Sequence, residues 1–313
     1  MNDDLQSRYP DKFVSEALLF QDIHRGDRIF IGTGCGEPQH LVQSLIGFVS
    51  SHPKAFVDAE VVQVWTLGLA PYTEEKFARN FRHNSFFISQ SSRSAVNEGL
   101  ADYTPVFLSK VPELLRRGLV EVDVALVQTS LPDEHGWMSL GVSVDIVKAA
   151  AEVAGFVIAQ VNPRMPRVHG DAFIHVDDVR YLVEHDEPLL EFPSEPEDEV
   201  VKRIGRYVAR LVEDGDTIQV GYGTIPNAIM SNLTEKKHLG VHTELIGDGL
   251  VDLMQRGVVD NSRKPIHRGK SVGSFCMGSP STYAYLHDNP VFAFHPIDYT
   301  NNPLVIAQHP TMT

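Results

Sequence analysis

Hydrophobic and polar positions follow the same order in two stretches of the chain that begin 189 residues apart. Each stretch starts with Gly-Asp, continues as a short apolar run and ends in a glycine-rich loop, at 26–34 and 215–223. Apolar residues at helical spacing follow in both, over 39–45 and 227–233. This order predicts a turn, a β-strand, a glycine loop and a helix after the proline in each stretch. Such a long interval indicates two copies of one domain, because solenoid repeats recur every roughly 20–50 residues.

The same periodicities predict further strands and helices along the chain. Short apolar runs predict strands at 28–31, 61–67, 85–88, 122–128, 156–161 and 303–307. Helical spacing predicts helices over 12–24, 39–50, 111–117, 145–154 and 200–211. Because strands alternate with helices, we expect an α/β fold with a mainly parallel sheet and flanking helices in each domain.

A proline-rich acidic segment separates the two halves of this pattern. Residues 187–199 (EPLLEFPSEPEDE) contain three prolines among acidic side chains, which is typical of a linker. We therefore expect an N-terminal α/β domain over 1–190 and a similar C-terminal one over 195–313. The second copy is the shorter, and the chain stops soon after the apolar run at 303–307. We expect the second domain to be partial and the natural protein to continue past Thr313.

Composition limits the classes of partner. The chain has 313 residues, of which 42% are hydrophobic and 22% charged, with a net charge of −14. It contains no Lys/Arg-rich stretch, which argues against a nucleic-acid partner. The two cysteines, Cys35 and Cys276, indicate a reducing compartment. The sequence from Met1 resembles no signal peptide, and no apolar run approaches the ~20 residues that span a bilayer. We expect a cytoplasmic protein without a membrane partner.

The two glycine loops are the first candidates for chemistry. Neither is a P-loop, and neither completes GxGxxG, because Glu37 and Pro226 stand where the third glycine would be. A single loop of this kind is more often a tight turn that needs glycine's backbone freedom. Since two occur in the same context, we expect at least one to bind an anion through backbone N–H groups.

A carboxylate near the second loop is the next candidate. Alternating positions over 241–246 predict a strand, the glycines of 247–249 a turn, and 250–255 a helix. Glu244 then lies near the carboxyl end of a strand, where open α/β sheets bind ligands. A carboxylate there can act as a nucleophile or a base, although the pattern alone favours an ordinary solvated glutamate.

Neither metal chemistry nor serine hydrolysis is expected. His238 and His242 are four residues apart, but the strand pattern argues against one helical face, and His169 and His175 lack a third ligand at characteristic spacing. HExxH, CxxC and the GxSxG elbow are all absent.

Long motifs in one order carry a resemblance over nearly the whole chain. They are GCGEP (34–38), NEGLADYTPVFLSK (97–110), GWMSLGVSVDIVKAA (136–150), QVNPRMPRVH (160–169), QVGYGTIPN (219–227), GVHTELIGDGLVDL (240–253) and NNPLVIA (301–307). With these motifs the chain resembles the acetyl-CoA hydrolase/CoA-transferase family. The resemblance implies two similar α/β domains with a CoA site between them. It also implies a second, Gly-Gly-Gln-type loop, which does not occur in this sequence.

The resemblance assigns roles to particular residues. It implies that Glu244 is the catalytic nucleophile. The CoA-binding loop of the family corresponds to Gly221, Tyr222, Gly223, Thr224 and Ile225. We expect the first loop to shape the acyl side of the site, with Gly34, Glu37 and His40 as candidate substrate-pocket residues.

The expected reaction is CoA transfer between an acyl-CoA and a short-chain carboxylate, by a ping-pong mechanism through a glutamyl-CoA thioester at Glu244. CoA is then a substrate, no cofactor is permanently bound, and a homodimer is compatible with the resemblance. Two alternatives stay open. Water in place of the acid would make the protein an acyl-CoA hydrolase, and the missing second loop fits a silent acyl-CoA-binding or regulatory module.

Overall fold

The computed structural model describes residues 5–192 and 198–313, which fold into two compact units. The N-terminal unit comprises 5–165 and 173–190, and the C-terminal unit comprises 166–172, 191–192 and 198–313. Residues 166–172 thus leave the first unit to join the second, which the sequence pattern did not indicate. The expected domain limits, 1–190 and 195–313, stay predictions, and the start of the second lies outside the described residues.

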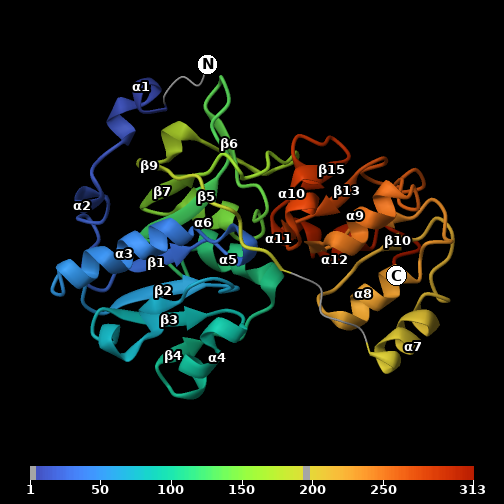
Figure 1. The fold of residues 1–313 in the computed structure, drawn as a ribbon, viewed down its shortest axis with the longest axis horizontal. Coiled ribbons are helices and arrows are strands. Elements are labelled where there is room, and N and C mark those ends of the chain that lie inside the picture. The colour runs from blue at the N-terminus through green and yellow to red at the C-terminus, as the bar shows by residue number, and fades with distance from the viewer. Residues whose placement is uncertain (1–4, 193–197) are drawn as a thin grey trace. The chain divides into compact units, whose positions relative to one another are not determined.

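A seven-stranded sheet forms the centre of the N-terminal unit, and all its neighbouring strands are parallel (Figure 1). In spatial order the strands are β4 (Ala101–Tyr103), β3 (Phe81–Ser85), β2 (Ala59–Gln63), β1 (Arg28–Ile31), β5 (Val124–Thr129), β7 (Phe156–Val161) and β9 (Tyr181–Glu184). The order reverses between β1 and β5, so the loop after β1 lies at the kind of switch point where open α/β sheets bind ligands.

Helices and a small antiparallel pair complete this unit. The helices are α1 (Leu5–Arg8), α2 (Glu16–Leu19), α3 (Gln39–Ser51), α4 (Gln90–Asn97), α5 (Val111–Arg116) and α6 (Val147–Val153). Short 3₁₀ helices are η1 (Pro10–Lys12), η2 (Gly34–Gly36), η3 (Pro71–Thr73), η4 (Glu75–Phe77), η5 (Leu108–Lys110) and η6 (Val176–Asp178). Strands β6 (Trp137–Ser139) and β8 (Phe173–His175) pair antiparallel.

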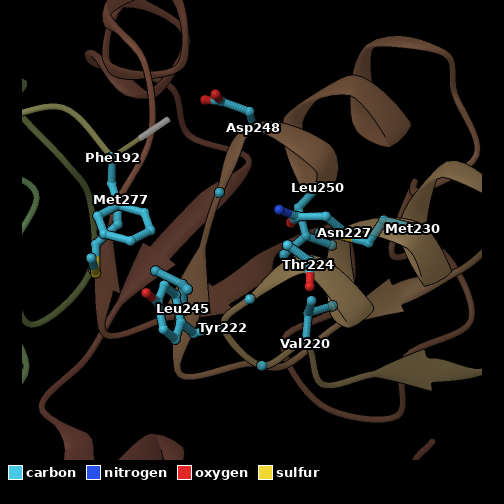
Figure 2. Close-up of a pocket in the computed structure, with 13 residues that line it drawn as sticks. Phe192, Val220, Tyr222, Thr224, Asn227, Met230, Leu245, Asp248, Leu250 and Met277 are labelled. Carbon is cyan, nitrogen blue, oxygen red and sulfur yellow. The ribbon is translucent and has the colours of Figure 1, made fainter. Parts of the chain in front are cut away.

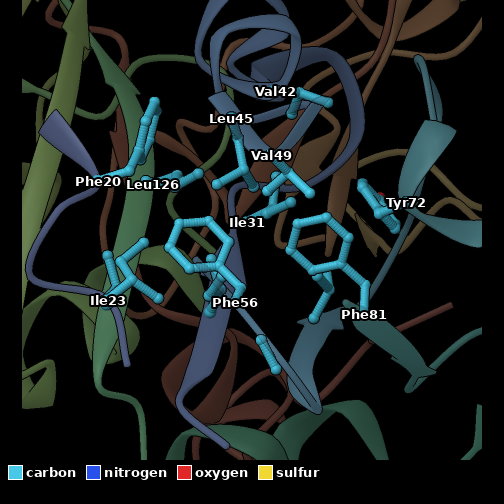
Figure 3. Close-up of a cluster of buried hydrophobic side chains, with 14 of the residues drawn as sticks. Phe20, Ile23, Ile31, Val42, Leu45, Val49, Phe56, Tyr72, Phe81 and Leu126 are labelled. Carbon is cyan, nitrogen blue, oxygen red and sulfur yellow. The ribbon is translucent and has the colours of Figure 1, made fainter. Parts of the chain in front are cut away.

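The apolar face of α3 explains how the sheet is covered. Its side chains Leu45 and Val49 are buried with Ile31, Phe56 and Phe81 in one cluster (Figure 3). Their spacing of four residues places both helix side chains on the same face. Burial of such side chains is the main favourable term that fixes this helix on the strands.

The C-terminal unit is also α/β, but its strands are shorter. Three parallel pairs are formed by β10 (Thr217–Ile218) with β11 (Gly240–Val241), β12 (Leu245–Ile246) with β14 (Phe275–Cys276), and β13 (Ser271–Gly273) with β15 (Phe292–Phe294). The helices are α7 (Glu199–Val208), α8 (Thr224–Ser231), α9 (Asp248–Gln255), α10 (Pro280–Leu286), α11 (Ile297–Thr300) and α12 (Pro303–Ile306).

The two Gly-Asp turns of the repeat have the same local structure. Gly26 and Gly215 have positive φ angles of 80° and 93°, which glycine adopts without strain. The following aspartates each accept a hydrogen bond from the backbone N–H three residues earlier, at 2.7 Å for Asp27 and 2.8 Å for Asp216. Each turn then leads into a strand that pairs in parallel with the next one, β1 with β2 and β10 with β11.

Several expected elements are wrong or displaced. The helix expected over 12–24 is reduced to the four residues of α2. The strand expected at 85–88 lies earlier, at β3. The strand expected at 303–307 is the helix α12, because Asn302 accepts from Leu304 N at its start and proline occupies the first position.

Three expected boundaries also change. The strand expected over 241–246 is broken into β11 and β12, with Glu244 in a bend between them. Helix α8 begins at Thr224, so Pro226 lies inside its first turn rather than before it. The start of the expected linker belongs to the N-terminal unit, where the Glu187 carbonyl accepts from Asn162 Nδ2 at 2.8 Å.

Candidate functional site

A cavity of about 290 Å³ in the C-terminal unit contains most of the predicted CoA-binding loop (Figure 2). Its lining residues are Phe192, Val220, Gly221, Tyr222, Gly223, Thr224, Asn227, Met230, Leu245, Gly247, Asp248, Leu250 and Met277. Ile225, the fifth predicted residue, does not line it and is 41% exposed. The mixture of apolar side chains with a few polar groups and backbone amides is typical of a small-molecule pocket.

The glycine loop is open on its ligand side. Tyr222 is 50% exposed, and its ring packs edge-on against Phe192 at 5.1 Å between centroids. Gly223 has φ 123°, caps the N-terminus of α8, and a Cβ placed on it would meet no atom within 4 Å. Backbone N–H groups at a helix N-terminus attract anions, so this loop has the geometry of an anion cradle.

A pair of hydrogen bonds ties this loop to the segment that carries Glu244. Val220 N donates to Thr243 Oγ1 at 2.9 Å, and that hydroxyl donates to the Val220 carbonyl at 3.0 Å. Leu245, on the other side of Glu244, lines the cavity. Glu244 itself does not line the cavity, but along the chain it lies between Thr243, which is bonded to the glycine loop, and Leu245, which is in the cavity wall.

The carboxyl group of Glu244 is partly buried and has one side-chain partner. Asn301 Nδ2 donates to its Oε2 at 2.6 Å, whereas Oε1 accepts no hydrogen bond from residues 5–192 or 198–313. Burial raises the pKa of Glu244 above its ordinary value, and the bond from Asn301 opposes that rise. The result is a carboxylate with one oxygen anchored and the other available.

The bend at Glu244 is fixed by the backbone of the neighbouring segment. Ser274 N and Phe275 N both donate to the Glu244 carbonyl, at 2.9 and 3.2 Å. Two donors on one acceptor interrupt the regular ladder, which explains why β11 does not continue into β12. Asn301, 57 residues away, is a site residue that periodicity could not identify, although it opens one of the motifs quoted above.

The first glycine loop, in the N-terminal unit, is closed instead. All residues from Gly32 to Glu37 are buried, and a Cβ on Gly36 would lie 2.5 Å from Ser143 Cβ. Thr33 Oγ1 donates to the buried Asp145 at 2.9 Å. Gly34, with φ 57°, donates its N–H to the Trp65 carbonyl. Its substrate role stays a prediction.

Glu37 is fully buried and well bonded. Its Oε2 accepts from the backbone N–H groups of Leu67 and Gly68, both at 3.1 Å, and its Oε1 accepts from Gln39 Nε2 at 2.9 Å. Burial nevertheless dominates and raises its pKa from 4.5 to about 7. In this unit Glu37 organises the loop after β2, and its predicted contact with substrate stays a prediction.

His40 is engaged by its own neighbours. Its ring stacks on His185 at 3.9 Å between centroids and lies 3.7 Å from a Glu16 oxygen. Burial and the nearby His185 lower its pKa, while Glu16 and Glu187 oppose that shift. Its predicted role in the substrate pocket also remains open to test.

The histidines considered for a metal lie apart. His238 bonds Asp260 at 2.7 Å, whereas His242 is buried and directed to the Thr300 carbonyl. Across 5–192 and 198–313, no three His, Cys, Asp or Glu side chains are grouped so that they could hold a metal ion. In the same residues, the helices are too short or too polar to cross a membrane.

Known proteins resemble this chain throughout its length. Residues 1–192 match the acetyl-CoA hydrolase/transferase N-terminal domain. The 4-hydroxybutyrate coenzyme A transferase of Clostridium kluyveri is 42% identical over 304 residues, which cover 97% of this chain and 70% of that protein. The succinyl-CoA:acetate/propanoyl-CoA:succinate CoA transferase of Fasciola hepatica is 38% identical over 307 residues, or 98% of this chain and 63% of that protein.

A solved structure agrees with these sequences. RipA from Yersinia pestis superimposes with a TM-score of 0.93 at 32% identity, covering 99% of this chain and 73% of RipA. Proteins named acetyl-CoA hydrolase are more distant, as in Candida glabrata, at 24% identity over 73% of this chain and 53% of that protein. The expected α/β fold and family resemblance are thereby confirmed. The chain belongs to the acetyl-CoA hydrolase/transferase family.

Proposed function

We propose that this protein transfers CoA between an acyl-CoA and a short-chain carboxylate, with Glu244 as the nucleophile. The observation that carries the proposal is the position of this carboxyl group. It is partly buried and anchored by Asn301 through one oxygen, and the next residue along the chain, Leu245, lines a cavity that the open glycine loop also lines. The printed names of the relatives, which include 4-hydroxybutyrate and succinyl-CoA:acetate CoA transferases, support the same class of reaction.

The reaction proceeds by two covalent intermediates. A Glu244 oxygen attacks the thioester carbonyl of the acyl-CoA, giving an acyl-glutamyl anhydride and releasing CoA as a thiolate. The thiolate then attacks the glutamyl carbonyl of the anhydride, which forms a glutamyl-CoA thioester and frees the first acid as a carboxylate. A second carboxylate attacks this thioester, and the same steps run in reverse. No net proton or electron is exchanged.

Each neighbour of Glu244 has a task in this scheme. Asn301 orients the carboxylate and favours its ionised form, against the burial that raises its pKa. The backbone N–H groups of the loop from Gly221 stabilise negative charge, on the oxyanion or on the bound CoA. Apolar side chains such as Leu245 and Met277 exclude water, which would otherwise hydrolyse either intermediate.

Acyl-CoA hydrolysis is the second candidate, because more distant relatives are named acetyl-CoA hydrolases. It uses the same Glu244 thioester but lets water take the place of the second acid. The two differ only in whether water reaches the intermediate. Neither assigns a permanent cofactor, since CoA enters and leaves as a substrate.

Isotope exchange separates the two candidates. The protein is incubated with acetyl-CoA and labelled acetate, without any other acid, while free thiol is measured. Transfer predicts that label enters acetyl-CoA and that free CoA does not accumulate, because the first half-reaction is reversible on its own. Steady release of free CoA, with or without exchange, would instead establish hydrolysis, because the hydrolase shares the reversible first half-reaction. Failure to observe either reaction would contradict the proposal.

A further inference from the structure

A buried histidine two residues before Glu244 contacts the segment that carries Asn301. His242 is 1% exposed, and its Nε2 lies 2.8 Å from the carbonyl oxygen of Thr300. A carbonyl only accepts, so the ring must carry its proton on Nε2. Thr300 is the last residue of α11, and the carbonyls at a helix end lack partners within their own helix. His242 supplies one of those missing donors.

Thr300 is held from a second side as well. Ser274 Oγ donates to Thr300 Oγ1 at 2.8 Å, while Ser274 N donates to the Glu244 carbonyl at 2.9 Å. Asn301 follows directly and donates to Glu244 Oε2. The backbone of Glu244 and the amide that holds its side chain are therefore fixed by one closed set of hydrogen bonds.

We propose that His242 is a positioning residue, whose Nε2–H bond to Thr300 holds Asn301 against the Glu244 carboxylate. The inference rests on the proposed role of Glu244 and extends it to a residue that touches no substrate. If His242 only filled space, the reaction rate would not depend on its N–H donor. Here the donor is the only polar contact of the ring, because Nδ1 is buried and has no partner in the described chain.

The groups around His242 keep its ring neutral. Lys264 Nζ donates to the Val241 and Lys270 carbonyls at 2.6 and 2.7 Å, so it is bonded to the residue before His242, and the centroids of the His242 and His309 rings are 5.0 Å apart. His267, His295 and Tyr299 are further titratable groups near it. Burial above all, together with the positive charge of Lys264 and His267, lowers the pKa of His242 to about 4, although the bond to Thr300 opposes the shift.

Two substitutions of graded length test the role. His242→Gln places an amide N–H near the position of Nε2, whereas the side chain of His242→Asn is one carbon shorter and reaches only the position of Nδ1. We expect His242→Gln to keep kcat/KM within about threefold, and His242→Asn to lower it about tenfold. Losing the Asn301 contact also removes the bond that opposes the raised pKa of Glu244, so the acidic limb of the kcat/KM profile should move to higher pH in His242→Asn alone.

CoA affinity and thermal unfolding of both variants separate positioning from folding. A folded His242→Asn with an unshifted acidic limb would overturn the inference, and so would equal losses in the two variants. If His242→Asn does not fold, the tautomer of His242 is measured in the wild-type protein instead. The measurement is ¹⁵N NMR of the imidazole rings, assigned through ring-to-backbone correlations. The expected signal is a neutral ring protonated on Nε2 at pH 6. A ring protonated on Nδ1, or on both nitrogens, would contradict the inference.

One of these readouts, the tautomer of the ring, is independent of the proposed function. The tautomer is measured without substrate, so it tests the contact whether or not Glu244 is the nucleophile. If Glu244→Gln keeps its turnover, the proposed mechanism fails. If Glu244→Gln is inactive but His242→Asn behaves as wild type, only the positioning role fails.

Discussion

In the loop after β1 every residue from Gly32 to Glu37 is buried, whereas Gly221 and Tyr222 in the loop after β10 are exposed and line a cavity. Each loop follows a Gly-Asp turn and a short strand, and these two preceding elements have the same sequence pattern in both copies. In the first loop, glycine is needed at position 36 because a side chain would collide with Ser143. In the second, Gly223 has open space but a backbone conformation that other residues rarely adopt.

The comparison extends to the two glutamates. Glu37 follows the first loop at once and is fully buried, with three donors on its two oxygens. Glu244 lies 21 residues after Gly223, is only partly buried, and keeps one oxygen without a partner in the described chain. A repeated sequence pattern thus fixes a local backbone geometry. The packing around it decides whether the loop is buried in the core or is open to a ligand.

The largest expected effect distinguishes the two carboxyl groups. Glu244→Gln removes the nucleophile with little change in volume, so turnover should fall by at least about 10³-fold while CoA still binds. Glu37→Gln is the comparison variant: because Glu37 is fully buried and bonded within its own unit, we expect turnover within about threefold, and a larger loss would support its predicted place in the substrate pocket. Steady-state kinetics and CoA titration check both. Near wild-type turnover in Glu244→Gln would remove the basis of the mechanism.

The second expected effect is a pH dependence of stability from Glu37. Its folded pKa, about 7, lies above its ordinary value of 4.5, so the folded state binds the proton more tightly than the unfolded state does. The stabilisation is therefore complete below about pH 4.5 and is lost as pH rises through 7, by up to about 3 kcal/mol. Asp145, whose pKa is raised to about 6, titrates in the same range.

Urea unfolding at pH 5 and pH 8 checks this, with wild type compared against Glu37→Gln. The difference between the two proteins isolates Glu37, because Asp145 is present in both. The variant should lose less stability than wild type between these pH values. Parallel losses would mean that Glu37 does not titrate where its burial predicts.

The third effect tests the packing of the first loop. Gly36→Ala should lower the free energy of unfolding by about 2 kcal/mol, because its Cβ would lie 2.5 Å from Ser143 Cβ. Ser143→Gly in the same chain removes the colliding atom and should recover part of the loss, as a double-mutant cycle would measure. CoA affinity should not change. An undiminished stability of Gly36→Ala would show that the loop is less tightly packed than described.

The smallest effect concerns the second loop. Gly221→Ala meets only Pro226 Cγ at 3.8 Å, so the protein should fold normally. Gly223→Val requires a valine at φ 123° and should displace the loop, weakening CoA binding about tenfold. Calorimetric titration with CoA compares the two. Equal, unchanged affinities would leave this loop with a structural role only.

The sequence predicted the elements whose residues form local, periodic patterns. The bounds of β1 and β7 are as expected, and α3 differs from its expected end by one residue. The helix expected over 12–24 is reduced to Glu16–Leu19, although Leu19, Phe20 and Ile23 are buried in one cluster at helical spacing, so periodicity predicted the buried residues but not the length of the helix. The strand expected at 303–307 failed because the cap by Asn302 outweighed an apolar run.

The site was predictable only in part, for a physical reason. Glu244 and the second loop lie in continuous motifs, so a sequence comparison could indicate them. Asn301 and the contact of His242 with Thr300 bridge 57 and 58 residues of chain, and such contacts depend on tertiary packing. Likewise, sequence periodicity does not distinguish the buried first loop from the open second one. The difference is that Ser143 packs against Gly36, whereas no atom lies within 4 Å of a Cβ placed on Gly223.

The most direct test of the account is to identify the covalent intermediate. The protein is incubated with acetyl-CoA, digested and analysed by mass spectrometry, with one sample reduced by borohydride to trap an activated carboxyl group. The account predicts that the peptide containing Glu244 carries CoA attached with loss of one water, and that this residue is reduced in the trapped sample. The adduct should be absent in Glu244→Gln. An adduct at another residue, or turnover without any adduct, would contradict the proposed role of Glu244.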